Sequence, residues 1–298
     1  MKTKISIVTP SYNQGHFLRR TLDSIIEQNV EGLELIVFDG GSTDDSVEIL
    51  ESYGDKLFYT SEKDEGQSDA VNKGFTRASG EIIGWLNSDD IYYPNALNSV
   101  LEVFEKYPEV DVIYGKADHI DESDKYMEDY YTEKWDYERL KEVCYICQPA
   151  VFFRKSVIEQ YGGLNKDLNY CMDYEFWLRI GKDKPFYYLE QKLAGSRLYV
   201  ENKTLGNRVA VHKEIISMIK EKFKTVPERW IYNLAHVLAE EEGLTRTNGT
   251  ENYKFVRTMV KKSAFLFFIY QKHIPIRQFK EMMSWLRHAK RMASEEAR

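Results

Sequence analysis

The chain has 298 residues, of which 43% are hydrophobic, 14% aromatic and 30% charged, and its formal net charge is −7. A chain of this length builds one large domain, or a domain with an appendage, around a sizeable core. No stretch approaches the ~20 apolar residues of a membrane-spanning helix, and a strand-like run begins already at Ile5, where no signal peptide is apparent. Composition therefore excludes a polytopic membrane protein and favours a cytoplasmic one.

The cysteines favour the same compartment. The chain has three cysteines, an odd number, so we do not expect a disulfide framework. A reducing environment is therefore expected. Cys144 and Cys147 form a CxxC pair, but the sequence has no second pair to complete a zinc site. A metal or redox role for this pair is the minor alternative.

Strand-like and helix-like segments alternate from residue 4 to about 115. Apolar runs predict strands at 4–9, 33–38, 57–61, 81–86 and 111–114, and amphipathic segments predict helices at 16–28, 43–53 and 94–107. The runs at 33–38 and 81–86 are almost continuously apolar, which is typical of parallel strands covered on both faces. The pattern predicts βαβ units and a mostly parallel sheet, whose ligands bind at the carboxyl ends of the strands.

Further elements follow this region. Residues 148–160 indicate a strand running into a helix, and residues 172–180 indicate a short helix. From about residue 206 the pattern is helical throughout. We therefore expect an α/β domain over residues 1–205 and a helical C-terminal extension over 206–298.

The loop after the second predicted strand reads Asp39-Gly40-Gly41-Ser42-Thr43-Asp44. Two interpretations stay open. Gly, Ser and Asp are the residues of turns and helix N-caps. Alternatively, the glycines let a ligand approach the backbone while Asp39 accepts from a nucleobase N–H or from ribose hydroxyls. A dinucleotide-binding fingerprint is excluded, because GxGxxG is absent and Asp39 would repel a phosphate.

The segment Asn87-Ser88-Asp89-Asp90 places two carboxylates at the end of an apolar run. Adjacent like charges repel and resist desolvation, so they must be neutralised or face water. One interpretation is a helix-capping pair ahead of Pro94. The interpretation we favour is a site for Mg²⁺ or Mn²⁺, which takes one or two carboxylates and completes its shell with phosphate oxygens and water.

Taken together, these motifs resemble those of glycosyltransferase family 2. The segments TPSYNQ, FDGGSTDDS, EGQSDAVNKGFTRASGEIIGWLNSDDIYYP and MDYEFWLRI occur in the family's order and spacing over roughly residues 4–205. The resemblance implies the GT-A fold, a Rossmann-like architecture with helices around a mostly parallel sheet. It also implies a nucleotide-sugar donor, usually a UDP-sugar, a manganese or magnesium cofactor at the DXD-type region, and inversion at the anomeric carbon.

The resemblance also assigns residues to the nucleotide sugar. It places Pro10, Ser11 and Tyr12 at the base, Asp39 at the uracil or ribose, and Asp69, Asn72, Lys73, Asn87 and Asp89 along the nucleotide and sugar. Asp90 is the implied metal ligand, with Asp89 beside it. Many relatives carry Asp at the position of Asn87, so here the cation field is weaker.

Asp173 matches the family's catalytic carboxylate, the base that takes the proton of the acceptor hydroxyl. The alternative for Asp173 is a helix N-cap. Met172 stands where a glutamate is common, and Glu175 lies two positions along the helix and faces elsewhere. Gln148 and Trp177 are implied on the acceptor side, although the helical spacing of Trp177 favours a core position.

The C-terminal region is basic. Residues 254–291 contain ten Lys or Arg against one acid, Glu281, a net charge of +9 that leaves −16 for the rest of the chain. Apolar side chains interleave with these charges, either in helices packed on the catalytic domain or in a surface touching anionic lipid, which we favour. No nucleic-acid-binding motif accompanies the charge. An earlier basic stretch, lying near the diphosphate or simply solvated, comprises Arg197, Asn202, Lys203 and Thr204.

The family resemblance implies a metal-dependent inverting hexosyltransferase in cell-envelope polysaccharide biosynthesis, and the composition and basic C-terminal region add the expectation that it is cytoplasmic and peripheral at the inner membrane face. It would move a sugar from a UDP-sugar to a hydroxyl of a glycan or lipid-linked acceptor. The alternative is a non-catalytic nucleotide-sugar-binding or scaffold subunit of a glycan assembly complex, which Asn87 and Met172 would suit. A sugar nucleotidyltransferase is disfavoured, because PSYNQGH is not the Gly-rich, basic loop that such an enzyme needs.

Overall fold

The computed structural model describes residues 4–199 and 202–296. The chain divides into two compact units, Met1–Leu140 with Cys144–Asn202, and Lys141–Val143 with Lys203–Arg298. The first unit ends at Asn202, three residues before the boundary expected after residue 205.

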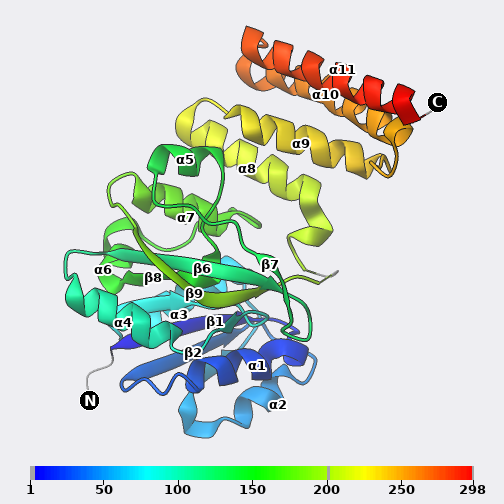
Figure 1. Cartoon of the computed structure of the whole chain (residues 1–298). Helices are drawn as coiled ribbons and strands as arrows, with labels where there is room; N and C mark the ends of the chain where they lie inside the picture. Colours follow the sequence, from blue (N-terminus) through cyan, green and yellow to red (C-terminus); the bar gives the residue numbers. More distant parts are fainter. Residues whose placement is uncertain (1–3, 200–201, 297–298) are drawn as a thin grey trace. The chain divides into compact units, whose positions relative to one another are not determined.

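Strands and helices alternate along most of the chain, and helices alone follow (Figure 1). The strands are β1 (Ile5–Ser11), β2 (Leu33–Asp39), β3 (Phe58–Ser61), β4 (Ile82–Trp85), β5 (Ile91–Tyr92), β6 (Val112–Ile120), β7 (Tyr126–Asp129), β8 (Val151–Arg154) and β9 (Tyr187–Arg197). The helices are α1 (Gly15–Ile26), α2 (Ser46–Glu51), α3 (Gln67–Arg77), α4 (Ala96–Lys106), α5 (Tyr137–Glu142), α6 (Lys155–Tyr161), α7 (Met172–Gly181), α8 (Arg208–Phe223), α9 (Glu228–Glu241), α10 (Gly249–Gln271) and α11 (Ile276–Glu296).

Within the described residues, one nine-stranded sheet runs in the order β3-β2-β1-β4-β8-β6-β9-β5, with β7 paired to β6. β3, β2, β1 and β4 are parallel, so their carboxyl ends meet at one edge. β8 is antiparallel to β4 and to β6, and β6 is parallel to β9. The expected α/β fold is confirmed, with the parallel strands β3, β2, β1 and β4 forming one half of the sheet. The strand and helix expected over 148–160 (β8, α6) and the helix expected over 172–180 (α7) are confirmed as well.

Helices lie on both faces of the sheet (Figure 1). Because successive side chains of a strand point to opposite faces, each face packs against its own set of helices. One face packs against α1, α2 and α4 in a core that includes Ile5, Ile7, Leu22, Leu50 and Val100. The other face is aromatic: the ring of Phe75 in α3 meets that of Phe153 in β8 edge-on, with centroids 5.5 Å apart, and Phe176 of α7 contacts both. The sheet is therefore covered on both sides, and its loops are left to form the site.

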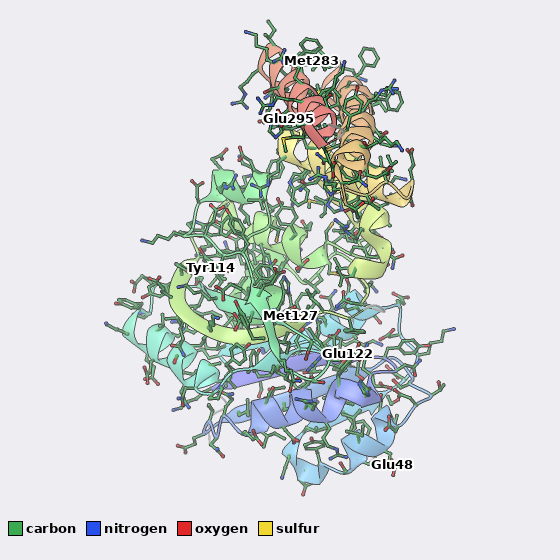
Figure 2. The ribbon with its side chains drawn as sticks, turned by 45° about the vertical axis from the view of Figure 1, so that its right-hand side comes forward. Glu48, Tyr114, Glu122, Met127, Met283 and Glu295 are labelled. Atoms are coloured by element: carbon green, nitrogen blue, oxygen red, sulfur yellow. The ribbon has the colours of Figure 1, made fainter. Side chains whose placement is uncertain are left out.

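The sequence pattern does not indicate β5, β7 or β9. β7 is exposed along its length, and Met127, labelled in Figure 2, is 52% exposed. β9 pairs antiparallel with β5, with Ile91 opposite Gly195. This pairing has a consequence for the site, because it carries the end of β9, at Arg197, to the turn that precedes β5.

In the second unit, the described helices α8, α9, α10 and α11 build a core of their own. Tyr232 of α9 contacts the rings of Phe267 and Trp285, at centroid distances of 5.4 and 4.9 Å. The Asn248 side chain caps α10 by accepting from the Glu251 N–H at 2.9 Å. The helical pattern expected from about residue 206 is confirmed. None of the helices in the described part of the chain combines the length and apolar character needed to cross a bilayer.

Candidate functional site at the carboxyl ends of the parallel strands

The residues expected at a nucleobase lie where β1 ends. Pro10 and Ser11 are buried, and the Ser11 carbonyl accepts from the Gly40 N–H at 2.8 Å. Tyr12, the next residue, is 61% exposed. Of the three, Tyr12 presents a ring that a planar base can stack on.

Asp39 lies at the end of β2 and is only 2% exposed. Its carboxylate accepts from the backbone N–H groups of Gly41 and Ser42 and, at 2.5 and 2.7 Å, from the hydroxyls of Ser42 and Ser61. Gly41 has φ +80°, a backbone conformation that favours glycine. Asp39 therefore stabilises the loop that follows it, as the turn interpretation expects. Its contact with a nucleoside stays a prediction.

Asn87 is the centre of an amide network beside the sheet edge. Its side-chain oxygen accepts from Gln67 Nε2 and from the Trp85 indole N–H, both at 2.9 Å. Its NH₂ group donates to Gln148 Oε1 at 2.9 Å and to Asp90 Oδ2 at 3.4 Å. A carboxylate at position 87 could not make the last two bonds, which gives the neutral residue here a structural reason.

The two carboxylates of the turn differ in exposure. Asp90 is 4% exposed, and its Oδ1 accepts from the Arg197 N–H at 2.9 Å. Asp89 is partly exposed, and its Oδ2 accepts from the hydroxyl of Tyr199 at 2.9 Å. Burial raises the pKa of both carboxyl groups, and the charge of Asp89 raises the pKa of Asp90 further.

A buried arginine supplies the opposite charge. The Arg197 side chain is fully buried, and its guanidinium donates to the carbonyls of Asp89 and Asp121 at 2.7 and 2.8 Å and pairs with Asp124 at 2.6 Å. It also lies 4.5 Å from the centroid of the Phe17 ring. The alternative of a solvated Arg197 is therefore wrong.

Sequence reasoning missed two further residues that hold this turn. The Thr21 hydroxyl in α1 lies 2.9 and 2.7 Å from the carbonyl oxygens of Ser88 and Asp90. Tyr199 fixes one oxygen of Asp89, as described above. Thr21 lies on the apolar helical face that predicts α1, and the single observation that could have marked it is a hydroxyl on that buried face.

Asp173 lies in the first turn of α7 and is partly buried. The N-cap of this helix is Cys171, so the N-cap alternative for Asp173 is wrong. Burial, followed by the charge of Asp173, raises the pKa of the Cys144 thiol. Burial also raises the pKa of the Cys147 thiol, the charge of Asp90 raises it further, and Asp173 contributes less.

Asp69 and Lys73 of α3 belong to a charged cluster. Lys73 Nζ lies 3.2 Å from Asp69 and 3.2 Å from Glu62, and Lys166 lies 3.2 Å from Asp69. Burial opposes the shift, but bonds from Lys166 and Lys73 lower the pKa of Asp69. Both residues line a hollow beside α3, and their contact with a nucleotide stays a prediction.

Asn72 is used differently. Its amide donates to the Leu164 carbonyl at 2.9 Å and accepts from the Leu164 N–H at 2.7 Å, so it fastens the loop before α7. A hollow of about 640 Å³ lies beside α3, and its lining consists of Phe38, Phe58, Glu62, Asp69, Asn72, Lys73, Thr76, Arg77 and Lys166. In the described residues this lining includes neither Asp89 nor Asp90.

The acceptor-side assignments change. Trp177 is 1% exposed and packs against Phe153 and Phe186, with centroids 6.4 and 6.1 Å away, so its acceptor role is wrong and the core alternative is confirmed. Gln148 is 9% exposed, and it donates to the Trp85 carbonyl at 2.6 Å while accepting from the amide network. Gln148 thus positions the network, and a contact with the acceptor stays a prediction.

We expect Trp177→Ala to lower the free energy of unfolding by about 3–5 kcal/mol, the usual cost of emptying a buried aromatic site. Chemical denaturation measures this change. The matched control is Tyr126→Ala, because Tyr126 is 60% exposed and its loss should change stability by less than ~0.5 kcal/mol. Unchanged stability in Trp177→Ala would contradict the core position of Trp177 and favour the acceptor-side assignment.

Asp89 and Asp90 could supply only some of the ligands that a hard divalent cation needs. Among the described residues, no group of three or more His, Cys, Asp and Glu side chains could hold a metal ion. Burial nevertheless raises the pKa of Asp89 and of Asp90, and for Asp90 the charge of Asp89 adds to it, so a bound cation would favour their charged forms. Mg²⁺ and Mn²⁺ use one or two protein carboxylates and take phosphate oxygens and water as their other ligands, so the pair fits such an ion bound together with a diphosphate.

Comparison with known proteins agrees with this geometry. An "uncharacterized glycosyltransferase" of Rickettsia prowazekii (strain Madrid E) is 29% identical over 213 residues, covering 67% of this chain and 65% of that protein. The chain thus spans less than two thirds of that relative's length. The crystal structure of S. aureus TarS 1–349 with UDP-GlcNAc is similar with a TM-score of 0.62 at 14% identity, over 98% of this chain and 92% of that one.

A second solved structure, the mannosyltransferase PcManGT from Pyrobaculum calidifontis with GDP-Man and Mn²⁺, is similar with a TM-score of 0.58 at 16% identity, over 96% of this chain and 86% of that one. At such identities the structures show the GT-A fold alone. The family described as Glycosyl transferase family 2 has a sequence model that matches residues 6–162, more than half of the 298 residues. The chain therefore belongs to glycosyl transferase family 2.

Proposed function

We propose that the protein is an inverting hexosyltransferase that uses a UDP-sugar and transfers its sugar to a hydroxyl of a glycan or lipid-linked acceptor in cell-envelope biosynthesis. Family membership supports sugar transfer. The fold neighbours, which are bound to UDP-GlcNAc and to GDP-Man with Mn²⁺, support a nucleotide-sugar donor and a divalent cation. The three free cysteines of the described chain support a cytoplasmic location.

One observation carries the proposal. The family model matches residues 6–162, a range that contains the loops after β1, β2 and β4 at the carboxyl ends of the parallel strands. Asp89 and Asp90 lie in the last of these loops, where a diphosphate with its cation would bind.

The chain's own residues would act as follows. Asp173 takes the proton of the acceptor hydroxyl as that oxygen attacks the anomeric carbon. A new C–O bond forms while the bond from the anomeric carbon to the diphosphate oxygen breaks, and the electron pair leaves with UDP. One displacement inverts the anomeric centre. Tyr12 and the loop that Asp39 organises would hold the uridine.

We propose Asp89, rather than Asp90, as the principal metal ligand. Asp90 is buried and its Oδ1 is bonded to the Arg197 N–H, whereas Asp89 is partly exposed and has one oxygen fixed by Tyr199. Asp89 would therefore be the principal ligand, with Asp90 setting the turn. When bound, Mg²⁺ or Mn²⁺ would stabilise the charge of the leaving diphosphate as a Lewis acid.

Calorimetric titration with UDP, GDP and dTDP, each with and without Mn²⁺, tests the donor class. We expect UDP to bind more tightly than the other two, and Mn²⁺ to strengthen its binding. Preference for GDP would retain transfer but overturn the UDP assignment. Absence of binding for all three nucleotides, with and without the metal, would contradict the proposed function.

A further inference from the structure

The turn between α10 and α11 is flanked by exposed apolar side chains. Phe265 and Phe268 are each 65% exposed, Ile269 is 37% exposed, and Ile276 and Phe279 beyond the turn are 75% and 50% exposed. We call these five residues the apolar patch. Spacings of three and four residues place the members from α10 on one stripe and those from α11 on another. Both stripes lie at the same end of the helix pair, since only four residues separate α10 from α11.

These side chains are not left over from a poorly formed core. In the same two helices Leu266, Phe267 and Met282 are 7%, 0% and 1% exposed. Met283, labelled in Figure 2, follows Met282 on α11 and is only partly exposed. Single exposed apolar residues are common, whereas several large ones gathered at one end of a helix pair are typical of an interaction surface.

Unpaired positive charge surrounds the apolar patch. Lys262 and Arg277 form ion pairs, with Glu242 and Glu228 at 2.6 and 2.7 Å. Lys261, Lys272 and Lys280 are exposed, and none of the ion pairs within the described residues includes them. The apolar patch is thus bordered by three lysines whose charges the protein does not neutralise.

We propose that the apolar patch docks the protein on an anionic lipid bilayer. The phenylalanine and isoleucine side chains enter the boundary between headgroups and acyl chains, and the three lysines bind lipid phosphates. A second copy of the chain fits less well, because a two-fold contact would set the same basic rim against itself. The proposal deepens the proposed function by placing the enzyme where a lipid-linked acceptor lies, but vesicle binding is measured without donor or acceptor, so either can fail alone.

Co-sedimentation of the full chain tests this docking, with vesicles of phosphatidylcholine alone and with phosphatidylglycerol added. We expect wild-type protein to sediment with the anionic vesicles only, less so at about 0.5 M than at about 0.1 M NaCl, because salt screens the lysines. Phe268→Asn with Ile276→Asn, and separately Lys272→Glu with Lys280→Glu, should each weaken binding at least about ten-fold.

Matched controls keep the test specific. Met292→Asn changes an apolar residue that is 42% exposed near the far end of α11, and Lys56→Glu with Lys182→Glu gives the same change of net charge from exposed lysines outside the helix pair. Both controls should sediment like wild type, and thermal melts confirm that each variant is folded. Equal sedimentation of wild type and the Phe268/Ile276 variant would overturn the proposal. So would a wild-type dimer that does not bind vesicles and that this variant converts to a monomer, because the apolar patch would then serve self-association.

Discussion

We expect Asp173→Asn to lower the rate of sugar transfer by about 10²–10⁴-fold, the usual contribution of a positioned general base. The amide has nearly the same shape as the carboxylate but cannot take up the proton of the attacking hydroxyl. Nucleotide affinity should stay within about two-fold of wild type, because the proposed uridine contacts lie on the loops after β1 and β2. The measurements are UDP release from a panel of UDP-sugars and calorimetric titration with UDP.

The control for this variant lies on the same helix. Glu175 is 7% exposed and bonds Arg179 at 2.9 Å, and Arg179 in turn donates to the Gly163 carbonyl at 2.8 Å. Glu175→Gln should therefore lower stability while each folded molecule keeps its rate, which separates loss of a base from loss of charge in α7. An unchanged rate in Asp173→Asn would remove its catalytic role. If wild type binds UDP and yet releases none from any donor, the non-catalytic alternative gains support.

The parallel half of the fold can be predicted from sequence because its signals are local. Strands buried on both faces are almost continuously apolar, as in 33–38 and 81–86, and the helices between them show a single apolar face. The rule that ligands bind at the carboxyl ends then selects the loops after β1, β2 and β4. Chain order and periodicity are sufficient for these inferences.

The contacts that hold the turn at residues 87–90 cannot be predicted in this way. Arg197 resembles any surface cation in the sequence, and its burial follows from the pairing of β9 with β5, which sets it beside residues 107 and 108 positions away. Asn87 likewise suggests a weakened metal ligand, whereas in the structure its amide makes bonds to Gln148 and Asp90 that a carboxylate could not make. Long-range contacts of this kind leave no periodic signal.

Replacing Asp89 with Asn should weaken metal-dependent UDP binding and at the same time stabilise the protein without ligand. Asp89 is the more exposed member of the pair, so its loss should remove most of the affinity that Mn²⁺ adds, on the order of 10–100-fold. Without it, Asp90 no longer faces a like charge. We expect the free energy of unfolding near neutral pH to rise by roughly 1 kcal/mol. Calorimetry and urea denaturation measure the two effects.

The gain in stability should depend on pH in a defined direction. The pKa of Asp89 and that of Asp90 are raised in the folded protein above the ordinary value of 3.8. A carboxyl of this kind binds its proton more readily when folded, so wild-type stability falls as the pH rises from about the ordinary value through the folded pKa. The advantage of Asp89→Asn over wild type should thus be small near pH 4 and grow towards neutral pH. A constant difference at all pH values would contradict the proposed repulsion.

Asp90→Asn distinguishes the two assignments of the metal ligand. In this variant an amide NH₂ would replace Asp90 Oδ2, which now accepts from the NH₂ group of Asn87, so two donors would meet in a buried place. We expect Asp90→Asn to gain no stability and to keep most of the Mn²⁺ effect on UDP binding. If Asp90→Asn abolishes that effect while Asp89→Asn keeps it, the assignment implied by the family resemblance is right and the exposure argument fails. Because both variants remove one negative charge from the same turn, a difference between them reports position and not net charge.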